Sequence, residues 1–391
     1  MSSWFTYTDE IGPEKILYVY DPEVGMKGVI VIDTWSLGGA GGGTRMLPDI
    51  TTGEMFGLAR AMTYKFAMLD LPVGGSKSGI WADPSLPPEK KEAILRAYGR
   101  ALKPLLEAGV TVGPDMGIDS RDVDAICRGA GVESKISGLS LQEKDGEPME
   151  NHATGYGVVA AAQAACEFSG IDIRGASVAL EGFGKAGGGV ARYIAEAGAK
   201  LVAVSTVGGA IYNENGLDVN KLLADRRGKG DSAVTEYPDA RKIKPAELFL
   251  LPVDVLVPGA RPSVINEKNA KKIKAKVISS IANNPITAGA HEILFTRKIQ
   301  VVPDFISNAG GVMVAVVDVL GGTVDDLFKA LREVIPLNVK ETLTGAREEK
   351  IPPMMLAVKQ VRDKIIKQRR REVETPSFEE LIAMLKKRLK I

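Results

Sequence analysis

The hydrophobic pattern of the first part of the chain predicts two strands followed by two helices. Residues 16–20 and 28–33 are short β-branched or aromatic runs, and the turn-like residues between them favour a hairpin or two adjacent strands. Apolar side chains recur at helical spacing from Glu54 to Phe66. A second helix is predicted from Glu89 to Ala108, because two prolines precede it and Gly109 follows it.

From Ala153 onward, predicted strands and helices alternate. The pattern predicts an alanine-rich helix opening at Thr154, a strand at 176–180, a glycine loop, a helix ending at Ala197 and a strand at 201–205. Short apolar strands follow, with helical stretches between them, at 253–257, 277–280 and 301–303. Such alternation predicts a doubly wound parallel sheet.

Residues 324–391 are predicted to be helical, and the basic run at 367–372 within them favours a solvated helix face. A chain of 391 residues is too long for one ordinary core and fits two domains of roughly 150–200 residues each. It is therefore long enough to build a cleft between domains.

Composition narrows the classes of partner. Lys and Arg number 50 against 49 Asp and Glu, so the net charge of +1 creates no global field that attracts nucleic acid or an anionic membrane. The first ten residues do not resemble a signal peptide, and no segment approaches the ~20 apolar residues that span a bilayer. Cys127 and Cys166 are expected to be buried structural thiols. We therefore expect a cytoplasmic protein with a small-molecule partner.

The string Gly182-Phe-Gly-Lys-Ala-Gly187 fits G-x-G-x-x-G between a predicted strand and a predicted helix. Its glycines would allow a tight turn and close approach of a pyrophosphate to the helix N-terminus. The string alone is a weak signal, and a purely structural glycine turn is the alternative. The strand before it, the helix after it and a second strand ending at Ser205 favour a dinucleotide site.

The position at which NAD-selective folds often carry an acidic residue for the ribose 2′-hydroxyl falls near Thr206, which is uncharged. No arginine follows at once. Both NAD and NADP therefore remain open as the cofactor.

Two lysines and an aspartate are candidates for the chemistry. Glycine-flanked Lys77 is predicted to lie on a loop, and Lys65 ends the preceding helix in Met62-Thr-Tyr-Lys65. In general, a partly desolvated lysine beside a second cation has a lowered pKa and can act as a base, while its neighbour can hold a carboxylate. Asp115, on a glycine-bounded loop, could pass protons to a nearby amine. Taken alone, these strings could equally be surface lysines and a turn aspartate.

Together the strings resemble the glutamate, leucine, phenylalanine and valine dehydrogenase family over nearly the whole chain and in the family's order. They are Gly42-Gly-Thr-Arg-Met46, Met62-Thr-Tyr-Lys65, Pro72-Val-Gly-Gly-Ser-Lys77, Gly113-Pro-Asp115, Ala153-Thr-Gly-Tyr-Gly157, the glycine loop, Ala282-Asn-Asn284 and Asn308-Ala-Gly-Gly-Val312. The resemblance implies reversible oxidative deamination of an L-amino acid to a 2-oxo acid and ammonia, with NAD or NADP as hydride acceptor.

The resemblance also implies residue roles. Lys77 would be the catalytic lysine, Asp115 the proton-transfer residue and Lys65 the anchor of the substrate carboxylate. The further candidates for substrate binding are Asn284, Gly41, Gly42, Met62, Gly113, Val312 and Ala315. Those for cofactor binding are Thr154, Gly182, Phe183, Gly184, Lys185, Ala186, Gly187, Ser205, Thr206, Ala282, Asn283 and Asn308, with Thr154 and Asn283 at the nicotinamide end.

Two departures from the family pattern bear on the substrate. In glutamate-specific relatives, a lysine before the glycine pair and a serine after N-A-G-G-V hold the side-chain carboxylate; here those positions resemble Gly41 and Ala315. Burying an unpaired anion costs several kcal/mol. Gly41, Gly113 and Ala315 would leave a roomier pocket, which favours a bulky aliphatic or aromatic amino acid. The alternatives are a glutamate dehydrogenase with a different carboxylate site and a non-catalytic, nucleotide-sensing protein.

The expected fold class is α/β, with an N-terminal α/β substrate and oligomerisation domain and a C-terminal Rossmann-type doubly wound dinucleotide-binding domain. We expect residues 1–150 to form the first, completed by helices at about 325–391, and residues 151–324 to form the second. The family suggests a homo-oligomer formed through the N-terminal domain. The expected partners are the amino acid or 2-oxo acid and ammonium, with no nucleic acid or membrane.

Overall fold

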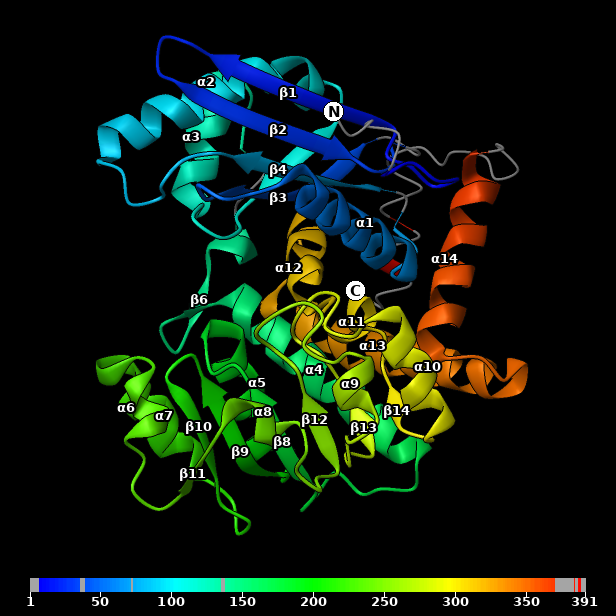
Figure 1. The fold of residues 1–391 in the computed structure, drawn as a ribbon. Helices are drawn as coiled ribbons and strands as arrows, with labels where there is room; N and C mark the ends of the chain where they lie inside the picture. The colour runs from blue at the N-terminus through cyan, green and yellow to red at the C-terminus, as the bar shows by residue number, and fades with distance from the viewer. Residues whose placement is uncertain are drawn as a thin grey trace. The chain divides into compact units, whose positions relative to one another are not determined.

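The computed structural model describes residues 7–35, 39–71, 73–134 and 138–369, together with 383, 386 and 387. The chain forms two compact units (Figure 1). Unit 1 comprises Met1–Leu141 and Lys359–Leu385, and unit 2 comprises Gln142–Val358 and Lys386–Ile391. Unit 1 therefore draws on two segments that are far apart in the sequence.

Unit 1 contains a five-stranded sheet of order β1-β2-β4-β3-β5. Its strands are β1 (Lys15–Asp21), β2 (Met26–Ile32), β3 (Ala40–Met46), β4 (Gly74–Ile80) and β5 (Val110–Gly113). The predicted hairpin is confirmed, since β1 and β2 pair antiparallel. Strand β4 pairs antiparallel with β2 and parallel with β3, which places it at the centre of the sheet.

Helices cover both faces of this sheet. Successive side chains of a strand point to opposite faces, so one strand contributes to two apolar clusters. Val29 and Val31 of β2 belong to the apolar cluster of α1 (Thr52–Met68), and Ile30 and Ile32 belong to that of α2 (Pro88–Glu107). Unit 1 also contains α3 (Ser120–Ala130) and a short 3₁₀ turn at Gly138–Leu141. The helices predicted at 54–66 and 89–108 are confirmed within two residues at each end.

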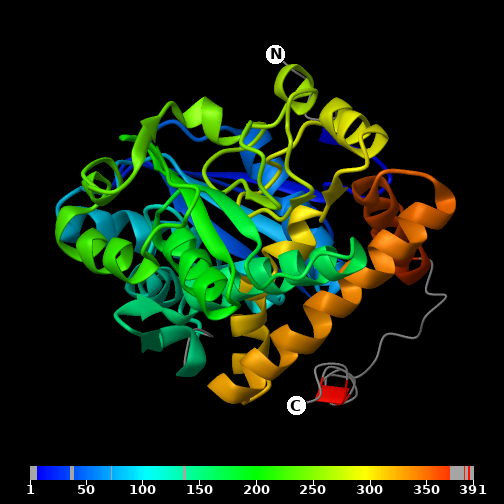
Figure 2. The ribbon, with the colours of Figure 1, turned by 90° about the horizontal axis from the view of Figure 1, so that it is seen from below.

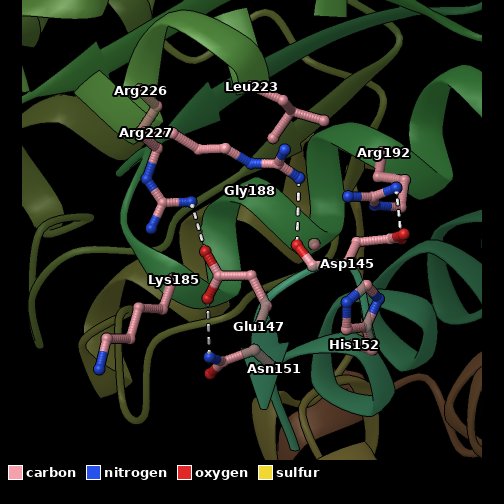
Figure 3. A pocket seen from close by; sticks show the side chains of 11 residues that line it. Asp145, Glu147, Asn151, His152, Lys185, Gly188, Arg192, Leu223, Arg226 and Arg227 are labelled. Carbon is pink, nitrogen blue, oxygen red and sulfur yellow. Dashed lines mark hydrogen bonds and ion pairs between the residues drawn. The ribbon is translucent and has the colours of Figure 1, made fainter. Parts of the chain in front are cut away.

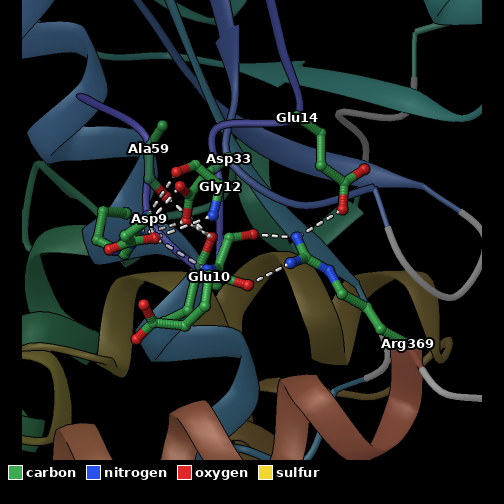
Figure 4. A network of polar contacts seen from close by, with 10 residues as sticks. Asp9, Glu10, Gly12, Glu14, Asp33, Ala59 and Arg369 are labelled. Carbon is green, nitrogen blue, oxygen red and sulfur yellow. Dashed lines mark hydrogen bonds and ion pairs between the residues drawn. The ribbon is translucent and has the colours of Figure 1, made fainter. Parts of the chain in front are cut away.

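A buried ion-pair network ties α1 to the sheet (Figure 4). Asp33 follows β2 and is fully buried, and both of its carboxylate oxygens accept from Arg60 Nε, at 3.0 and 2.8 Å. Thr63 Oγ1 donates to the same carboxylate at 2.6 Å, and Arg60 pairs with Asp9 at 2.6 Å. Burial raises the pKa of Asp33, although Arg60 and Thr63 oppose that effect. The network holds the helix whose last turn carries Lys65.

The seven-stranded sheet of unit 2 has the order β11-β10-β9-β8-β12-β13-β14. Five strands are parallel: β8 (Ser177–Glu181), β9 (Lys200–Thr206), β12 (Val255–Val257), β13 (Val277–Ile278) and β14 (Gln300–Val301). The predicted parallel core is therefore confirmed. At one edge, β10 (Gly209–Tyr212) and β11 (Arg241–Ile243) add two antiparallel strands that the hydrophobic pattern did not predict.

The helices of unit 2 include α4 (Met149–Phe168), α5 (Lys185–Glu196), α12 (Gly310–Val319) and α13 (Val324–Glu349). The shorter ones are α6 (Val219–Lys229), α7 (Ser232–Thr235), α8 (Pro245–Leu248), α9 (Glu267–Ala270), α10 (Ala288–Thr296) and α11 (Asp304–Ser307). A hairpin of β6 (Glu143–Lys144) and β7 (Glu147–Pro148) precedes α4. Helix α4 begins five residues before the predicted start at Thr154, which lies in its second turn.

The domain bounds differ from those expected. The structure divides the chain at Gln142, and α13 packs against α4 within unit 2 (Figure 2), whereas residues from about 325 were expected to join the N-terminal domain. Only the part of α14 (Pro353–Arg369) from Lys359 onward groups with unit 1.

The expectation that the basic run at 367–372 forms a solvated face is wrong for Arg369, which donates to the backbone oxygens of Glu10 and Ile11 and to Glu14. Residues 370–372 lie outside the described part of the chain. Cys127 and Cys166 are buried free thiols, as predicted. Among the described helices, none is both long and apolar enough to cross a membrane.

Candidate active site and dinucleotide site

Lys77 and Asp115 form a close ion pair in unit 1. Lys77 Nζ lies 2.5 Å from Asp115 Oδ2, and Lys77 is only 8% exposed. The predicted loop around Lys77 is wrong, because residues 74–80 form the central strand β4. Asp115 does lie in a tight turn two residues after β5, where its backbone pairs with Ile118. A rigid strand and a short turn thus bring the two expected residues together.

Arg45 and Gly43 complete this cluster, although the sequence analysis gave neither a role. Arg45 Nε lies 3.3 Å from Asp115 Oδ2, and Arg45 Nη2 lies 3.4 Å from Oδ1. The other side of the same guanidinium pairs with Glu54 at 2.5 Å. At Gly43, a Cβ atom would stand 2.9 Å from Lys77 Nζ and 3.1 Å from Asp115 Cβ. The sequence did hold one signal for these two residues. Gly43 and Arg45 lie two positions apart, and residues i and i+2 of a strand share a face, so both were expected on the same side of the sheet.

The electrostatics of the cluster favour an ionised Asp115. Burial raises the pKa of Asp115, but the charges of Lys77 and Arg45 and the hydrogen bond from Met116 N outweigh burial and hold that pKa below its ordinary value. The sequence analysis expected a second cation beside Lys77. In the structure, Lys77 Nζ and Arg45 Nε both contact Asp115 Oδ2, at 2.5 and 3.3 Å.

The substrate-binding candidates of unit 1 lie on the elements around this cluster. Lys65 is buried in the last turn of α1, and half-buried Met62 lies one turn before it on the same face. Gly41 and Gly42 lie in β3, and Gly113 ends β5 opposite Gly43. A Cβ atom at Gly41 would lie 2.8 Å from Thr111 Oγ1 and 3.4 Å from the ring of Phe66, whereas at Gly113 it would meet only Gly42 O, at 3.8 Å.

The glycine loop of unit 2 has the geometry of a dinucleotide cradle. Gly182 adopts φ 90°, and a Cβ atom at Gly187 would stand 1.9 Å from Gly182 O, so that both positions require glycine. Gly184 caps α5 and faces open space, and its two successors, Lys185 and Ala186, form the first turn of α5. The open helix N-terminus fits a pyrophosphate.

Two neighbours complete the loop. Phe183 is buried, and Gly182 N donates to Ser205 O at 3.1 Å at the end of β9, where Thr206 follows. Thr206 Oγ1 donates to Asp231 O at 3.3 Å. The loop therefore lies next to the strand end that carries the expected ribose position.

A cluster of asparagines lies beyond β13 in the same unit. Asn308 Nδ2 donates to Ile281 O at 3.0 Å, Ala282 O at 3.3 Å and Asn283 Oδ1 at 3.0 Å. Asn308 Oδ1 is buried and lacks a partner among the described residues. A buried acceptor of this kind fits an amide donor such as that of a nicotinamide. Asn284 is exposed, adopts φ 51° and donates its backbone N–H to Asp304.

The remaining candidates cluster at the start of α12. A Cβ atom at Gly311 would lie 2.8 Å from Thr154 Oγ1, so α4 and α12 meet at Thr154. Val312 is half-buried one residue further on, and Ala315 is exposed one turn along the helix. The cofactor candidates and these two substrate candidates are thus all positions of unit 2.

Unit 1 holds a buried lysine–aspartate pair, and unit 2 holds a glycine-loop cradle on a mainly parallel sheet. Together these features define a nicotinamide-dependent oxidoreductase of small molecules. The chain belongs to the Glutamate/Leucine/Phenylalanine/Valine dehydrogenase family, whose model matches residues 146–368, while the model of the family's dimerisation domain matches residues 13–130. It is an NAD(P)-dependent amino acid dehydrogenase that acts on the CH–NH₂ group.

Two relatives illustrate the similarity in sequence. The NADP-specific glutamate dehydrogenase of Saccharolobus shibatae is 37% identical over 286 residues, which cover 71% of this chain and 67% of the relative. The NAD-specific glutamate dehydrogenase A of Halobacterium salinarum is 35% identical over 282 residues, which cover 70% and 64%.

Two solved structures illustrate the similarity in fold. The hetero-hexameric glutamate dehydrogenase of Thermus thermophilus in its Leu-bound form aligns with a TM-score of 0.80 and 27% identity, over 93% of this chain and 91% of its own. The L-tryptophan dehydrogenase of Nostoc punctiforme aligns with a TM-score of 0.68 and 26% identity, over 92% and 98%.

Proposed function

We propose that this dehydrogenase oxidises a bulky apolar L-amino acid to its 2-oxo acid and ammonia. The observation that carries the proposal is Gly41, which offers no cation where glutamate-type relatives are expected to carry a lysine. The atoms nearest to a Cβ at Gly41 belong to Thr111 and the ring of Phe66, neither of which is charged. Ala315, the second expected position, offers no hydrogen-bond donor. A substrate carboxylate would be left unpaired there, at a cost of several kcal/mol.

Burial in this pocket would lower the free energy of an apolar side chain, whereas it would raise that of the glutamate carboxylate. Each buried methylene contributes about 0.8 kcal/mol, so a leucine-sized or phenylalanine-sized side chain gains a few kcal/mol over alanine if the pocket closes around it. The L-tryptophan dehydrogenase of Nostoc punctiforme supports the idea that this fold can accept a large aromatic side chain.

The proposed roles in the reaction follow from the ion pair in unit 1. Lys65 holds the substrate carboxylate, and NAD(P), when bound, supplies the acceptor for the hydride that leaves the substrate Cα. Lys77 in its neutral form removes a proton from the water that attacks the imino acid, and ionised Asp115, 2.5 Å from Lys77 Nζ, stabilises the ammonium that forms. The carbinolamine nitrogen then takes that proton from Lys77, and Asp115 accepts the hydroxyl proton as the C–N bond breaks and ammonia leaves.

A substrate panel tests the proposal. Wild-type enzyme should give a higher kcat/KM with leucine, phenylalanine or tryptophan than with glutamate or alanine, measured by the absorbance of the reduced cofactor. The double variant Gly41→Lys with Ala315→Ser should shift preference toward glutamate, with Ala315→Ser alone as the control. Preference of wild type for glutamate over every apolar amino acid would refute the proposal.

Glutamate dehydrogenase is the second candidate, and the names of the relatives favour it, because the glutamate dehydrogenases of Saccharolobus shibatae and Halobacterium salinarum are 37% and 35% identical to this chain. On that hypothesis, another side chain supplies the carboxylate contact. The same panel separates the candidates.

We also propose a cytoplasmic homo-oligomer that assembles through unit 1. The match to a dimerisation-domain model supports this assembly, as does the edge strand β1, on which Leu17, Tyr18 and Tyr20 are exposed. Light scattering coupled to size exclusion should show an oligomer that Tyr20→Lys weakens. A monomeric wild type would contradict the assembly.

A further inference from the structure

Polar side chains at α11 hold the loop that follows β13 in unit 2. Ser307 Oγ donates to Ser280 O at 2.8 Å, and Asn308 Nδ2 donates to each of the next three loop residues. Asn284 N then donates to Asp304 Oδ2 at 2.8 Å. Five consecutive loop residues are thus held by three side chains.

These three side chains share one face of a single helical turn, because residues i, i+3 and i+4 are neighbours on a helix surface. Asp304 and Ser307 belong to α11 and Asn308 is its C-cap, and all three residues are buried. None of the residues 280–284 and 304–308 lines the cavity among the β6–β7 hairpin, α4, α5 and α6 (Figure 3). The contacts therefore serve a different part of unit 2.

Asn284 has a backbone conformation that needs such support. Its φ of 51° lies in the left-handed region, whereas a residue that precedes a proline, here Pro285, favours an extended backbone. A strained conformation of this kind persists only where surrounding contacts fix it. Asp304 accepts from Asn284 N, and Ser263 N donates to Asn284 O at 2.9 Å. Of these two contacts, the one with Asp304 is made by a side chain and can be removed by substitution.

The side-chain amides of Asn283 and Asn284 keep donors that these contacts do not use. Asn283 Oδ1 accepts from Asn308, which leaves Asn283 Nδ2 for a ligand. Asn284 is exposed, and its side chain makes no hydrogen bond within the described residues. An amide on a fixed backbone is preorganised for a ligand, because little conformational freedom is lost when it binds.

We propose that Asp304 is a positioning residue for the dehydrogenase reaction. It fixes the backbone at Asn284 and thereby orients Asn283 toward the nicotinamide and Asn284 toward the amino acid. The inference rests on the proposed function and on the roles expected of these two asparagines within it. Asp304 is itself only 2% exposed, so it acts through the loop and not by contact with a ligand.

Asp304→Ser and Asp304→Asn test the proposal. Serine lacks the carboxyl oxygen that accepts from Asn284 N, so the KM of the amino acid and the Kd of NADH or NADPH should each rise by about tenfold. Asparagine keeps an oxygen that can accept the N–H, so Asp304→Asn should hold both constants within about threefold of wild type. The Kd is measured by fluorescence titration without amino acid, so it requires no turnover.

The same substitutions in an Asn284→Gly chain show whether Asp304 acts through Asn284. Glycine adopts the left-handed conformation freely but has no amide side chain to orient, so Asp304→Ser should raise the KM of the amino acid no further there. The loss of cofactor affinity should persist, because Asn283 remains. If Asp304→Ser does not fold, Asp304→Asn replaces it. Its neutral oxygen accepts a weaker hydrogen bond, and its smaller rise in KM should likewise disappear in the Asn284→Gly chain.

Asp254→Ser is the matched control. Asp254 Oδ2 also accepts a backbone N–H, from Ser177 at 2.9 Å, but at the start of β8, the end of that strand opposite to the glycine loop. This variant should lower the melting temperature and leave both constants unchanged. The KM is measured on whichever amino acid wild type prefers, so an unexpected preference would refute the proposed substrate without affecting this test.

Three results would overturn the inference. Folded Asp304→Ser could leave both constants unchanged, which would show that the loop needs no support from Asp304. Its effect on KM could be as large in the Asn284→Gly chain, which would show that it does not act through Asn284. Asp254→Ser could raise the constants equally, which would show that any loosening of unit 2 has this effect.

Discussion

Replacing Gly43 with alanine should damage catalysis without unfolding the protein. The new methyl group would stand 2.9 Å from Lys77 Nζ, 2.8 Å from Pro114 O and 3.1 Å from Asp115 Cβ, where ordinary contacts begin at 3.4 Å. Relief of the first contact requires Lys77 Nζ to move by about 0.5 Å (3.4 − 2.9), which disturbs its ion pair with the Asp115 carboxylate. A lysine side chain can move this far, and relief of the 2.8 Å contact needs a shift of the Pro114 carbonyl in the turn before Asp115, so β3 should stay paired with β4.

The magnitude follows from the geometry. A misplacement of 1 Å in a reacting group costs about 10²-fold in rate, so about half that distance should lower kcat by about 10- to 100-fold. This loss corresponds to about 1.4–2.7 kcal/mol of activation free energy. The assay is steady-state kinetics on the preferred amino acid at saturating cofactor, with the melting temperature measured in parallel.

Gly57→Ala is the matched control, because a Cβ atom at Gly57 in α1 meets nothing within 4 Å. It should leave kcat unchanged and stabilise the helix by up to about 1 kcal/mol. Unchanged turnover in Gly43→Ala would show that the Lys77–Asp115 contact is not needed for the reaction. A large drop in melting temperature would instead show that the methyl group disrupts the sheet.

Three further outcomes are expected. Lys77→Ala should nearly abolish turnover while the cofactor still binds, as checked by fluorescence titration of NADH or NADPH; a variant that keeps most of its kcat would remove Lys77 from the chemistry. Arg45→Gln should raise the pKa of Asp115 by removing one of the two cations that lower it, so the acid limb of kcat/KM should move to higher pH, and an unmoved limb would contradict the assignment. Arg60→Met should lower the free energy of unfolding by about 3–5 kcal/mol, because Asp33 is left buried and unpaired, and Asp33→Asn in the same chain should recover part of the loss in chemical denaturation.

The strands and helices that follow a clear hydrophobic period were predictable, and so was the glycine loop. Glycine-rich strands were not, because glycine disfavours strands in isolation. In β3, however, a Cβ atom at Gly42 would stand 1.7 Å from Ser76 O. The close packing of β3 on β4 therefore requires the residues that local propensity would keep out of a sheet.

Tertiary contacts explain the rest of what the sequence pattern missed. Strands β10 and β11 have four and three residues, too few to show a period, and they form because β10 pairs with the edge of β9 and β11 pairs with β10. Arg45 lay in a recognised string, but only folding shows that its guanidinium reaches Asp115. Phe66 and Thr111 come from different elements, so their closeness to Gly41 could not be read from spacing.

The composition of unit 1 from two distant segments has a consequence for synthesis on the ribosome. Arg369 contacts Glu14 across a sequence separation of 355 residues. At roughly 5–20 residues per second, the partner of Glu14 emerges roughly 20–70 s after the strand that it fastens. The main segment of unit 2, Gln142–Val358, is translated within that interval. During translation, the first segment of the chain therefore waits without its C-terminal helix while the dinucleotide-binding unit is made.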